Sequence, residues 1–231
     1  MHGMTHPAPP FNLSVPPYRL SGAVYSALLN DPRQLQALGD AVHQPPYKAP
    51  PRAPVLAVRP RNTLAGDGDA IAVPAGHGAL RTGASLGIVI GRSACRVAEA
   101  DALSMVAGYL VSNDLSLPLA SHYRPAVRQM ARDGFCPLGA AVPAAQVANP
   151  DALAITLALD GQPVWQGHTG GRVRGVAALL SAVSGFMTLQ PGDVLLLGIS
   201  ADAPLACAGQ RMRVTIAGIG ALHNTLVAEA A

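Results

Sequence analysis

The chain has 231 residues, of which 50% are hydrophobic and 13% are charged. This length and composition allow one large domain with a sizeable core and exclude global disorder. The net charge is +3, but the 16 Lys and Arg residues form no basic run with interleaved aromatic residues, so the sequence does not indicate nucleic-acid binding.

The first 17 residues, MHGMTHPAPPFNLSVPP, predict a flexible, proline-rich arm. They lack the basic start and apolar centre of a signal peptide. No apolar run of about 18 residues is free of Gly, Pro and charge, so no membrane span is expected. The cysteines Cys95, Cys136 and Cys207 are odd in number and far apart. This usage is typical of reduced thiols and predicts a cytoplasmic protein. Cys136 is either a buried structural thiol or a nucleophile.

Residues 18–50 predict a small N-terminal segment that begins with a strand at 18–29. The proline cluster QPPYKAPPRAP (44–54) excludes regular structure and marks a boundary. Between them, residues 31–42 indicate a short helix, with Asp31 as N-cap and Pro32 at the first helical position. On that helix Leu35 and Leu38 are expected to share one apolar face.

Residues 51–231 predict a single domain built mainly from strands. Strands are expected within residues 54–63, 65–74, 83–92, 109–112, 153–167, 191–199 and 211–229. The pair at 153–167 turns at Asp160-Gly161, a favourable turn dipeptide. Helices are expected at 99–107, in part of 119–132, and at 172–189, where apolar residues recur at helical spacing: Val173, Val176, Leu179, Leu180, Val183 and Phe186. The fold class is therefore mostly β with a few helices (α+β).

Carboxylates are scarce where a metal site would need them. The chain has only two glutamates, Glu99 and Glu229. Magnesium and similar ions prefer oxygen ligands, so any such site must rest on aspartate.

Several segments, taken together and in order, resemble the fumarylacetoacetate hydrolase family over roughly residues 50 to 228. They are RPRNT (59–63), the Gly-Asp-Gly loop (66–68), SLGIVIGR (85–92), DALSMVAGYLVSNDLS (101–116), RDGFCPLG (132–139), LQPGDVLLLG (189–198) and IAGIGALHN (216–224). PPYKAPP, NDLSLP and YRPA narrow the likeness to the branch of isomerase/decarboxylases in 4-hydroxyphenylacetate catabolism. The resemblance implies a mixed β roll, usually present as a homodimer or paired with a homologous second subunit or domain.

The resemblance also implies a site for Mg²⁺ or Mn²⁺ held by three carboxylates. Two glutamates spaced E-x-E open the strand that ends in V-I-G, and here those positions are Gly83 and Ser85. The third ligand is retained as Asp114, so the metal is expected to bind weakly or not at all. Further family positions differ as well, at Gln34, Ala37, Met130 and Ile199.

For this branch the implied substrate is a small oxo-carboxylate, 5-oxopent-3-ene-1,2,5-tricarboxylate, which is decarboxylated before its product is isomerised. Whether the chain is itself an enzyme is left open by the missing carboxylates. It is a subunit that turns over this substrate, a non-catalytic partner of a metal-bearing homologue, or a binding module for a small dicarboxylate.

Six residues are candidates for the site, with Asp114 and Arg124 as catalytic groups and Arg59, Asn62, Tyr123 and Asp133 as substrate contacts. Four of them have an ordinary alternative. Asp114 can cap a turn, Arg59 can serve a strand end, and Tyr123-Arg124 can bind a substrate carboxylate or pair with Asp133. The histidines His122 and His168 are possible bases or plain hydrogen-bonding residues, and His223 is expected to be structural.

Overall fold

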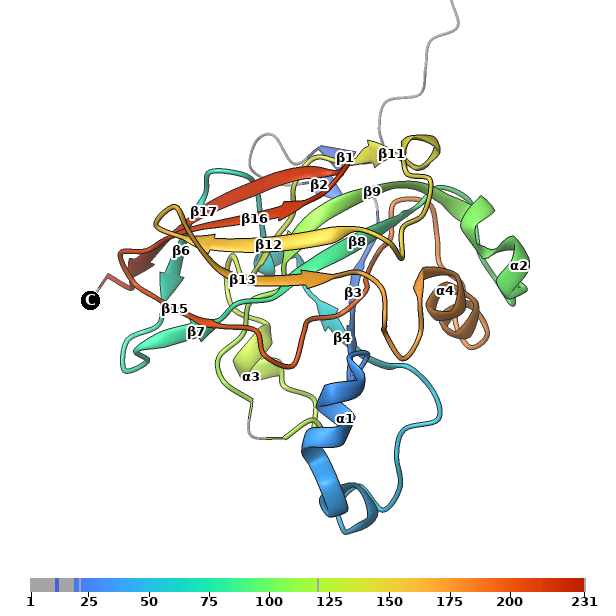
Figure 1. The fold of residues 1–231 in the computed structure, drawn as a ribbon, viewed down its shortest axis with the longest axis horizontal. Helices are drawn as coiled ribbons and strands as arrows, with labels where there is room; N and C mark the ends of the chain where they lie inside the picture. The colour runs from blue at the N-terminus through green and yellow to red at the C-terminus, as the bar shows by residue number, and fades with distance from the viewer. Residues whose placement is uncertain (1–10, 13–18, 21, 120, 231) are drawn as a thin grey trace, which may run out of the picture.

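The computed structural model describes residues 11–12, 19–20, 22–119 and 121–230 (Figure 1). The predicted arm at residues 1–17 lies mostly outside them. Strands dominate this part of the chain, and none of its helices is long and apolar enough to cross a bilayer.

A six-stranded mixed sheet carries the candidate site. Its strands in spatial order are β11 (Val142–Pro143), β9 (Val106–Asn113), β8 (Ala84–Ile90), β14 (Val194–Leu196), β3 (Val24–Leu28) and β4 (Val55–Arg59). Neighbours are antiparallel except β14 and β3, which run parallel. Strand β3, from the predicted N-terminal segment, is therefore an interior strand of this sheet, and β4 lies at its edge.

A five-stranded sheet packs against the first one. Its order is β13 (Gln162–His168), β12 (Ala154–Leu159), β16 (Arg211–Ile216), β17 (Gly220–Ala228) and β6 (Ala70–Val73). The hairpin predicted at Asp160-Gly161 is confirmed as the β12–β13 turn, where both residues have positive φ values of 50° and 83°. Such a turn matches the twist of the strands that it joins.

Three strand pairs complete the β structure. They are β1 (Phe11–Asn12) with β2 (Arg19–Leu20), β5 (Leu64–Ala65) with β10 (Cys136–Pro137), and β7 (Ala79–Arg81) with β15 (Leu205–Cys207).

The α-helices of the described residues are short: α1 (Pro32–Leu38), α2 (Glu99–Ala102), α3 (Val127–Met130) and α4 (Val176–Ser184). Single 3₁₀ turns are η1 (Gly39–His43), η2 (Arg61–Thr63), η3 (Leu103–Met105) and η4 (Ala144–Gln146). Helices α2 and α4 lie side by side at one end of the sheets, while α1 projects from the molecule (Figure 1).

Helix α1 confirms its predicted start but not its predicted face. The Asp31 side chain accepts a hydrogen bond from the Arg33 backbone N–H at 2.9 Å, as an N-cap does. Gln34 is the buried residue of this helix, whereas Leu35 and Leu38 are only half-buried.

The helices expected at 99–107 and 172–189 are shorter than predicted, whereas α3 lies within 119–132, which was expected to be helical in part. Helix α4 begins after Gly175 and ends at Gly185, so Val173 and Phe186 lie outside it and are 42% and 59% exposed. Its buried face, Val176, Leu179, Leu180 and Val183, is as predicted. Tertiary contacts explain the late start, because the Val173 N–H already bonds the Asn30 carbonyl at 2.9 Å.

The main core lies between the two large sheets and against α4. Strand β8 is buried at every position. Its residues Leu86, Ile88 and Ile90 face the main core, and Val89 faces a second cluster on the opposite side of the sheet. Side chains alternate along a strand, so an uninterrupted apolar run requires cover on both faces.

Candidate functional site

Asp114 lies directly after β9 and is the centre of a buried polar cluster. Its side chain is 1% exposed and forms an ion pair with Arg59, the last residue of β4. One oxygen, Oδ1, accepts from Arg59 Nη2, and the other, Oδ2, accepts from Ser26 Oγ in the middle of β3. Both carboxylate oxygens therefore have a side-chain donor.

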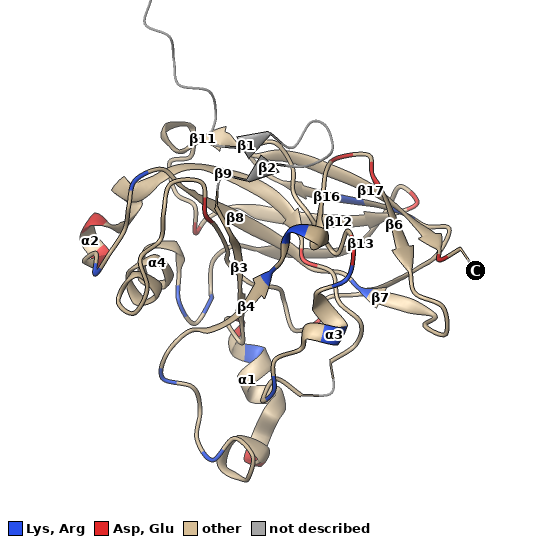
Figure 2. Cartoon of the chain, turned by 180° about the vertical axis from the view of Figure 1, so that it is seen from behind, with Lys and Arg blue, Asp and Glu red and all other residues tan. Residues whose placement is uncertain are grey.

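Arg59 is held from several directions. Its side chain is fully buried and also donates hydrogen bonds to the backbone carbonyls of Met130 and of Leu115, the latter at 2.9 Å. In the view from behind, basic positions lie on β4, in the turn after it and on α3 (Figure 2), and Arg59 is the last residue of β4. Buried charges need such partners, because an uncompensated ion in the interior is costly.

Of the two positions that the family resemblance associates with glutamates, Gly83 lies against this cluster and Ser85 contacts Gly198. Strand β8 pairs with β9, and the Gly83 N–H donates to Asn113 Oδ1 at 2.7 Å while the Gly83 carbonyl accepts from the Asp114 N–H at 2.8 Å. A Cβ atom on Gly83 would collide with the Asp114 backbone. Ser85 Oγ accepts from the Gly198 N–H at 3.1 Å.

The other predicted site residues lie at two further places. Asn62 donates to Asp133 Oδ1 at 2.8 Å, and both side chains are at an exposed position. Tyr123 and Arg124 instead line a pocket of about 390 Å³. The structure thus joins Arg59 with Asp114, and Asn62 with Asp133, but does not gather all six residues in one cavity.

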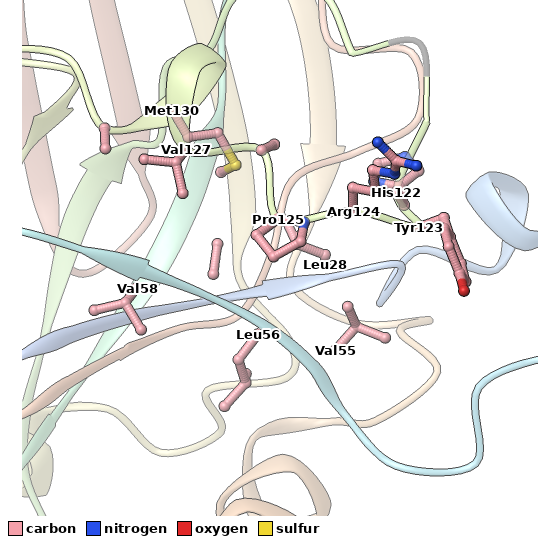
Figure 3. A pocket seen from close by; sticks show the side chains of 13 residues that line it. Leu28, Val55, Leu56, Val58, His122, Tyr123, Arg124, Pro125, Val127 and Met130 are labelled. Atoms are coloured by element: carbon pink, nitrogen blue, oxygen red, sulfur yellow. The ribbon is translucent and has the colours of Figure 1, made fainter.

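The pocket has an apolar wall and a polar end (Figure 3). Leu28 and Val55–Val58 of the sheet edge form the wall, and Val127 and Met130 of α3 face it. His122, Tyr123 and Arg124 lie together at the other end (Figure 3). Sequence reasoning missed this wall, since nothing in the sequence places edge strand β4 beside residues 122–131.

His122, at the polar end of the pocket, has an imidazole pKa below its ordinary value. Burial, and then the positive charge of Arg81, lower the pKa of its imidazole. Its Nδ1 is buried and has no hydrogen-bond partner among the described residues. The tyrosine Tyr123 packs edge-on against Tyr47, with ring centroids 5.8 Å apart.

Several remaining candidates have plain structural surroundings. Cys136 is fully buried in β10, and burial raises the pKa of its thiol to about 12, so it is not a thiolate near neutral pH. Exposed His223 lies 3.1 Å from Asp67 through Nδ1. Ser26 was not singled out in the sequence, although a serine inside the apolar strand VYSAL is a signal of a buried polar contact.

In the described part of the chain, no group of three or more His, Cys, Asp or Glu residues is arranged to hold an ion.

The mixed β architecture and the sequence around Asp114 define a class of protein. The model of the fumarylacetoacetate (FAA) hydrolase C-terminal family matches residues 23–227, and the chain belongs to this family. The predicted fold class is confirmed by solved structures. One is a 5-carboxymethyl-2-hydroxymuconate delta-isomerase from Mycobacterium smegmatis, with a TM-score of 0.74, 27% identity, and coverage of 90% of this chain and 77% of that chain.

Among characterised relatives, the chain is similar to bifunctional isomerase/decarboxylases. It is 41% identical over 210 residues to the enzyme of 4-hydroxyphenylacetate degradation from Escherichia coli, covering 91% of this chain and 48% of that protein. The counterpart from Salmonella dublin is 40% identical with the same coverage. The chain thus spans about half the length of these relatives.

More distant relatives have other activities. An oxaloacetate tautomerase of Oryza sativa subsp. japonica is 33% identical, with coverage of 73% of this chain and 78% of the relative. The fold also matches a fumarylpyruvate hydrolase from Pseudomonas aeruginosa, solved with Mn²⁺ and pyruvate, at a TM-score of 0.74 and 24% identity over 99% of this chain and 100% of that chain. A protein of the same fold is therefore known with bound Mn²⁺.

Proposed function

We propose that this chain is a subunit of an isomerase/decarboxylase of 4-hydroxyphenylacetate catabolism, and that its own metal position is degenerate. The substrate would be 5-oxopent-3-ene-1,2,5-tricarboxylate, followed by its decarboxylation product. Similarity to the Escherichia coli enzyme over 91% of the chain supports this assignment.

The surroundings of Asp114 carry the second half of the proposal. Mg²⁺ and Mn²⁺ sites need several oxygen ligands, and a divalent ion in this family would stabilise developing enolate charge. Here Asp114 is already bonded to Arg59 and Ser26. The guanidinium would repel a metal ion, and Gly83 and Ser85 supply no carboxylate. The residues present do not fit a three-carboxylate site.

What remains for this chain is recognition of a carboxylate substrate or support of a partner. Arg124 and Tyr123 at the polar end of the 390 Å³ pocket would bind a carboxylate through the planar guanidinium fork and the phenol. Asn62, Asp133 and Arg59 would then shape the surroundings of that pocket, with Arg59 acting only through its contacts to Asp114 and Met130.

A second candidate function is a non-catalytic partner that pairs with a metal-bearing homologous subunit. The buried Arg59–Asp114 pair favours it, because both charges already have partners within the fold, whether or not substrate is present. A binding module for a small dicarboxylate is the remaining alternative. The assembly is proposed to be a homodimer or a pairing with a homologous second subunit, and the location to be cytoplasmic.

The experiment compares the chain alone with the chain plus a homologous subunit that retains E-x-E. Decarboxylation of the oxo-tricarboxylate is followed with added Mg²⁺ or Mn²⁺. We expect no turnover by the chain alone and more turnover by the pair than by the metal-bearing subunit alone.

Variants separate the roles. Arg124→Leu is expected to raise KM in the pair if this pocket binds substrate, and the exposed Arg213→Leu is the matched control. Turnover by the chain alone that disappears in Asp114→Asn, but persists in the exposed control Asp101→Asn, would contradict the degenerate site.

A further inference from the structure

A second, polar pocket of about 170 Å³ lies between the start of α1 and the end of β13. It contains none of the six predicted site residues. Its lining is Asp31, Arg33, Gly167, His168, Gly170, Gly171, Arg172 and Ser200.

Arg172 is a buried cation with poor partners. Its side chain is only 4% exposed, and its Nε has no hydrogen-bond partner among the described residues. The other guanidinium contacts are long, at 3.4 Å to the Ile199 carbonyl, 3.3 Å to the His168 carbonyl and 3.4 Å to Ser200 Oγ. Strong N–H···O⁻ bonds of arginine are about 2.7–2.9 Å, so this side chain has unused donor capacity.

Neighbouring charges do not satisfy Arg172. The nearest carboxylate oxygen, Asp31 Oδ2, is 3.9 Å from its Nη1, beyond hydrogen-bonding distance. That same oxygen accepts from Arg33 Nη2 at 2.8 Å and from the Ala201 N–H at 3.0 Å. Arg33 in turn bonds Asp202 through both Nη atoms at 3.0 Å. Arg33 therefore forms ion pairs with two aspartates, Asp31 and Asp202. Arg172 has no carboxylate of the described residues within hydrogen-bonding distance.

The rest of the lining suits an anionic guest. His168 Nδ1 accepts from the Gly170 N–H at 3.0 Å, which leaves Nε2 as the ring nitrogen that can donate to a ligand. Gly171 has φ of +72° and open space where a side chain would be, so the backbone can approach a ligand closely.

The geometry points to a binding site for a small monocarboxylate on Arg172. The planar guanidinium matches a carboxylate, and its free Nε would gain an acceptor. Two arginines and two aspartates meet here, so the local charge is balanced and a monoanion fits better than a dianion. This site does not depend on the proposed function.

The test is a titration of the isotope-labelled full chain with acetate and pyruvate, followed by amide NMR shifts, with sodium chloride of equal ionic strength as the reference. We expect saturable binding of one anion, with shifts confined to the residues around the pocket, 31, 33, 167–172 and 200. Arg172→Leu should weaken binding at least about tenfold, the effect of losing a charged hydrogen-bonding partner.

The exposed Arg92→Leu is the matched control and should bind as the unaltered chain does. No saturation, shifts elsewhere, or unchanged affinity in Arg172→Leu would overturn the site. Inorganic phosphate binding more tightly than acetate and pyruvate would overturn the monocarboxylate assignment. If Arg172→Leu fails to fold, the location of the shifts in the unaltered chain decides.

Discussion

Asp114 illustrates how a charged residue in this chain depends on its immediate neighbours. It lies at a place where its family relatives would be expected to use a carboxylate for metal, yet its oxygens accept from Arg59 and Ser26. The sequence was enough to single out Asp114 as a candidate site residue. Its partners were not predictable, because Arg59 and Ser26 are 55 and 88 residues away along the chain.

Removing one partner of this pair should be costly. Arg59→Met would leave the Asp114 carboxylate buried without its cation, and we expect the free energy of unfolding to fall by about 3–5 kcal/mol. Urea denaturation measures this change. The double variant Arg59→Met/Asp114→Leu should recover much of the loss, because no buried charge remains. A single variant as stable as the unaltered chain would show that the pair contributes nothing.

Asp31 makes the stability of the fold depend on pH in the acid range. Burial alone would raise its pKa, but hydrogen bonds from the Arg33 side chain and from the Ala201 and Arg33 amides outweigh burial and lower the pKa to about 2. A lowered pKa stabilises the fold above the unfolded value of 3.8, and this stabilisation is lost as the pH falls toward 2. It is on the order of 2 kcal/mol at neutral pH.

The measurement compares the unaltered chain with Asp31→Asn in urea between pH 7 and pH 2. Their difference in stability should be constant above about pH 5 and shrink below it. Asp101→Asn, at an exposed position of α2, is the control and should differ by less than about 0.5 kcal/mol at pH 7. A difference that persists undiminished at pH 2 would be inconsistent with the lowered pKa.

At the scale of elements, the start of β8 brings the backbone of Gly83, where the family resemblance expects a glutamate, against Asp114. Strand spacing of two predicts that residues 83 and 85 share one face. What spacing cannot predict is how closely the next strand approaches. The contact between Gly83 and the Asp114 backbone leaves no room for a Cβ, so restoring a glutamate would require the strands to move.

Two glycines near and within β8 form a matched pair for a test. Gly83→Ala would press a Cβ into backbone, whereas Gly87→Ala would meet mainly the end of the Leu110 side chain, which can turn away. We expect Gly83→Ala to cost about 1–3 kcal/mol of unfolding free energy and Gly87→Ala to cost less. Equal costs, measured by urea denaturation, would refute the close approach of β8 and β9.

Element types were more predictable than element ends. The apolar run of β8 and the Asp160-Gly161 hairpin are local patterns and are confirmed. The ends of α4 and the buried face of α1 depend on tertiary contacts. Gln34 is buried because the surrounding fold, and not the apolar pattern of α1 itself, decides which face of this helix is covered.

At the scale of the whole molecule, the fold separates groups that the sequence suggested as one site. The Arg59–Asp114 pair is buried, Asn62 and Asp133 are exposed, and Tyr123 with Arg124 line the apolar pocket. Order along the chain indicates the family, and the family indicates the fold. Neither the family nor the fold predicts which side chains come into contact, because this depends on how closely strands and loops that are distant in the sequence approach each other.

We expect that this chain, by itself, does not bind a divalent ion tightly at Asp114. The direct measurement is the metal content of the isolated chain after equilibration with Mn²⁺ and removal of free ion. We predict far less than one equivalent per chain, and no difference between the unaltered chain and Asp114→Asn. One tightly bound Mn²⁺ per chain, lost in Asp114→Asn, would contradict the proposal that the metal position is degenerate.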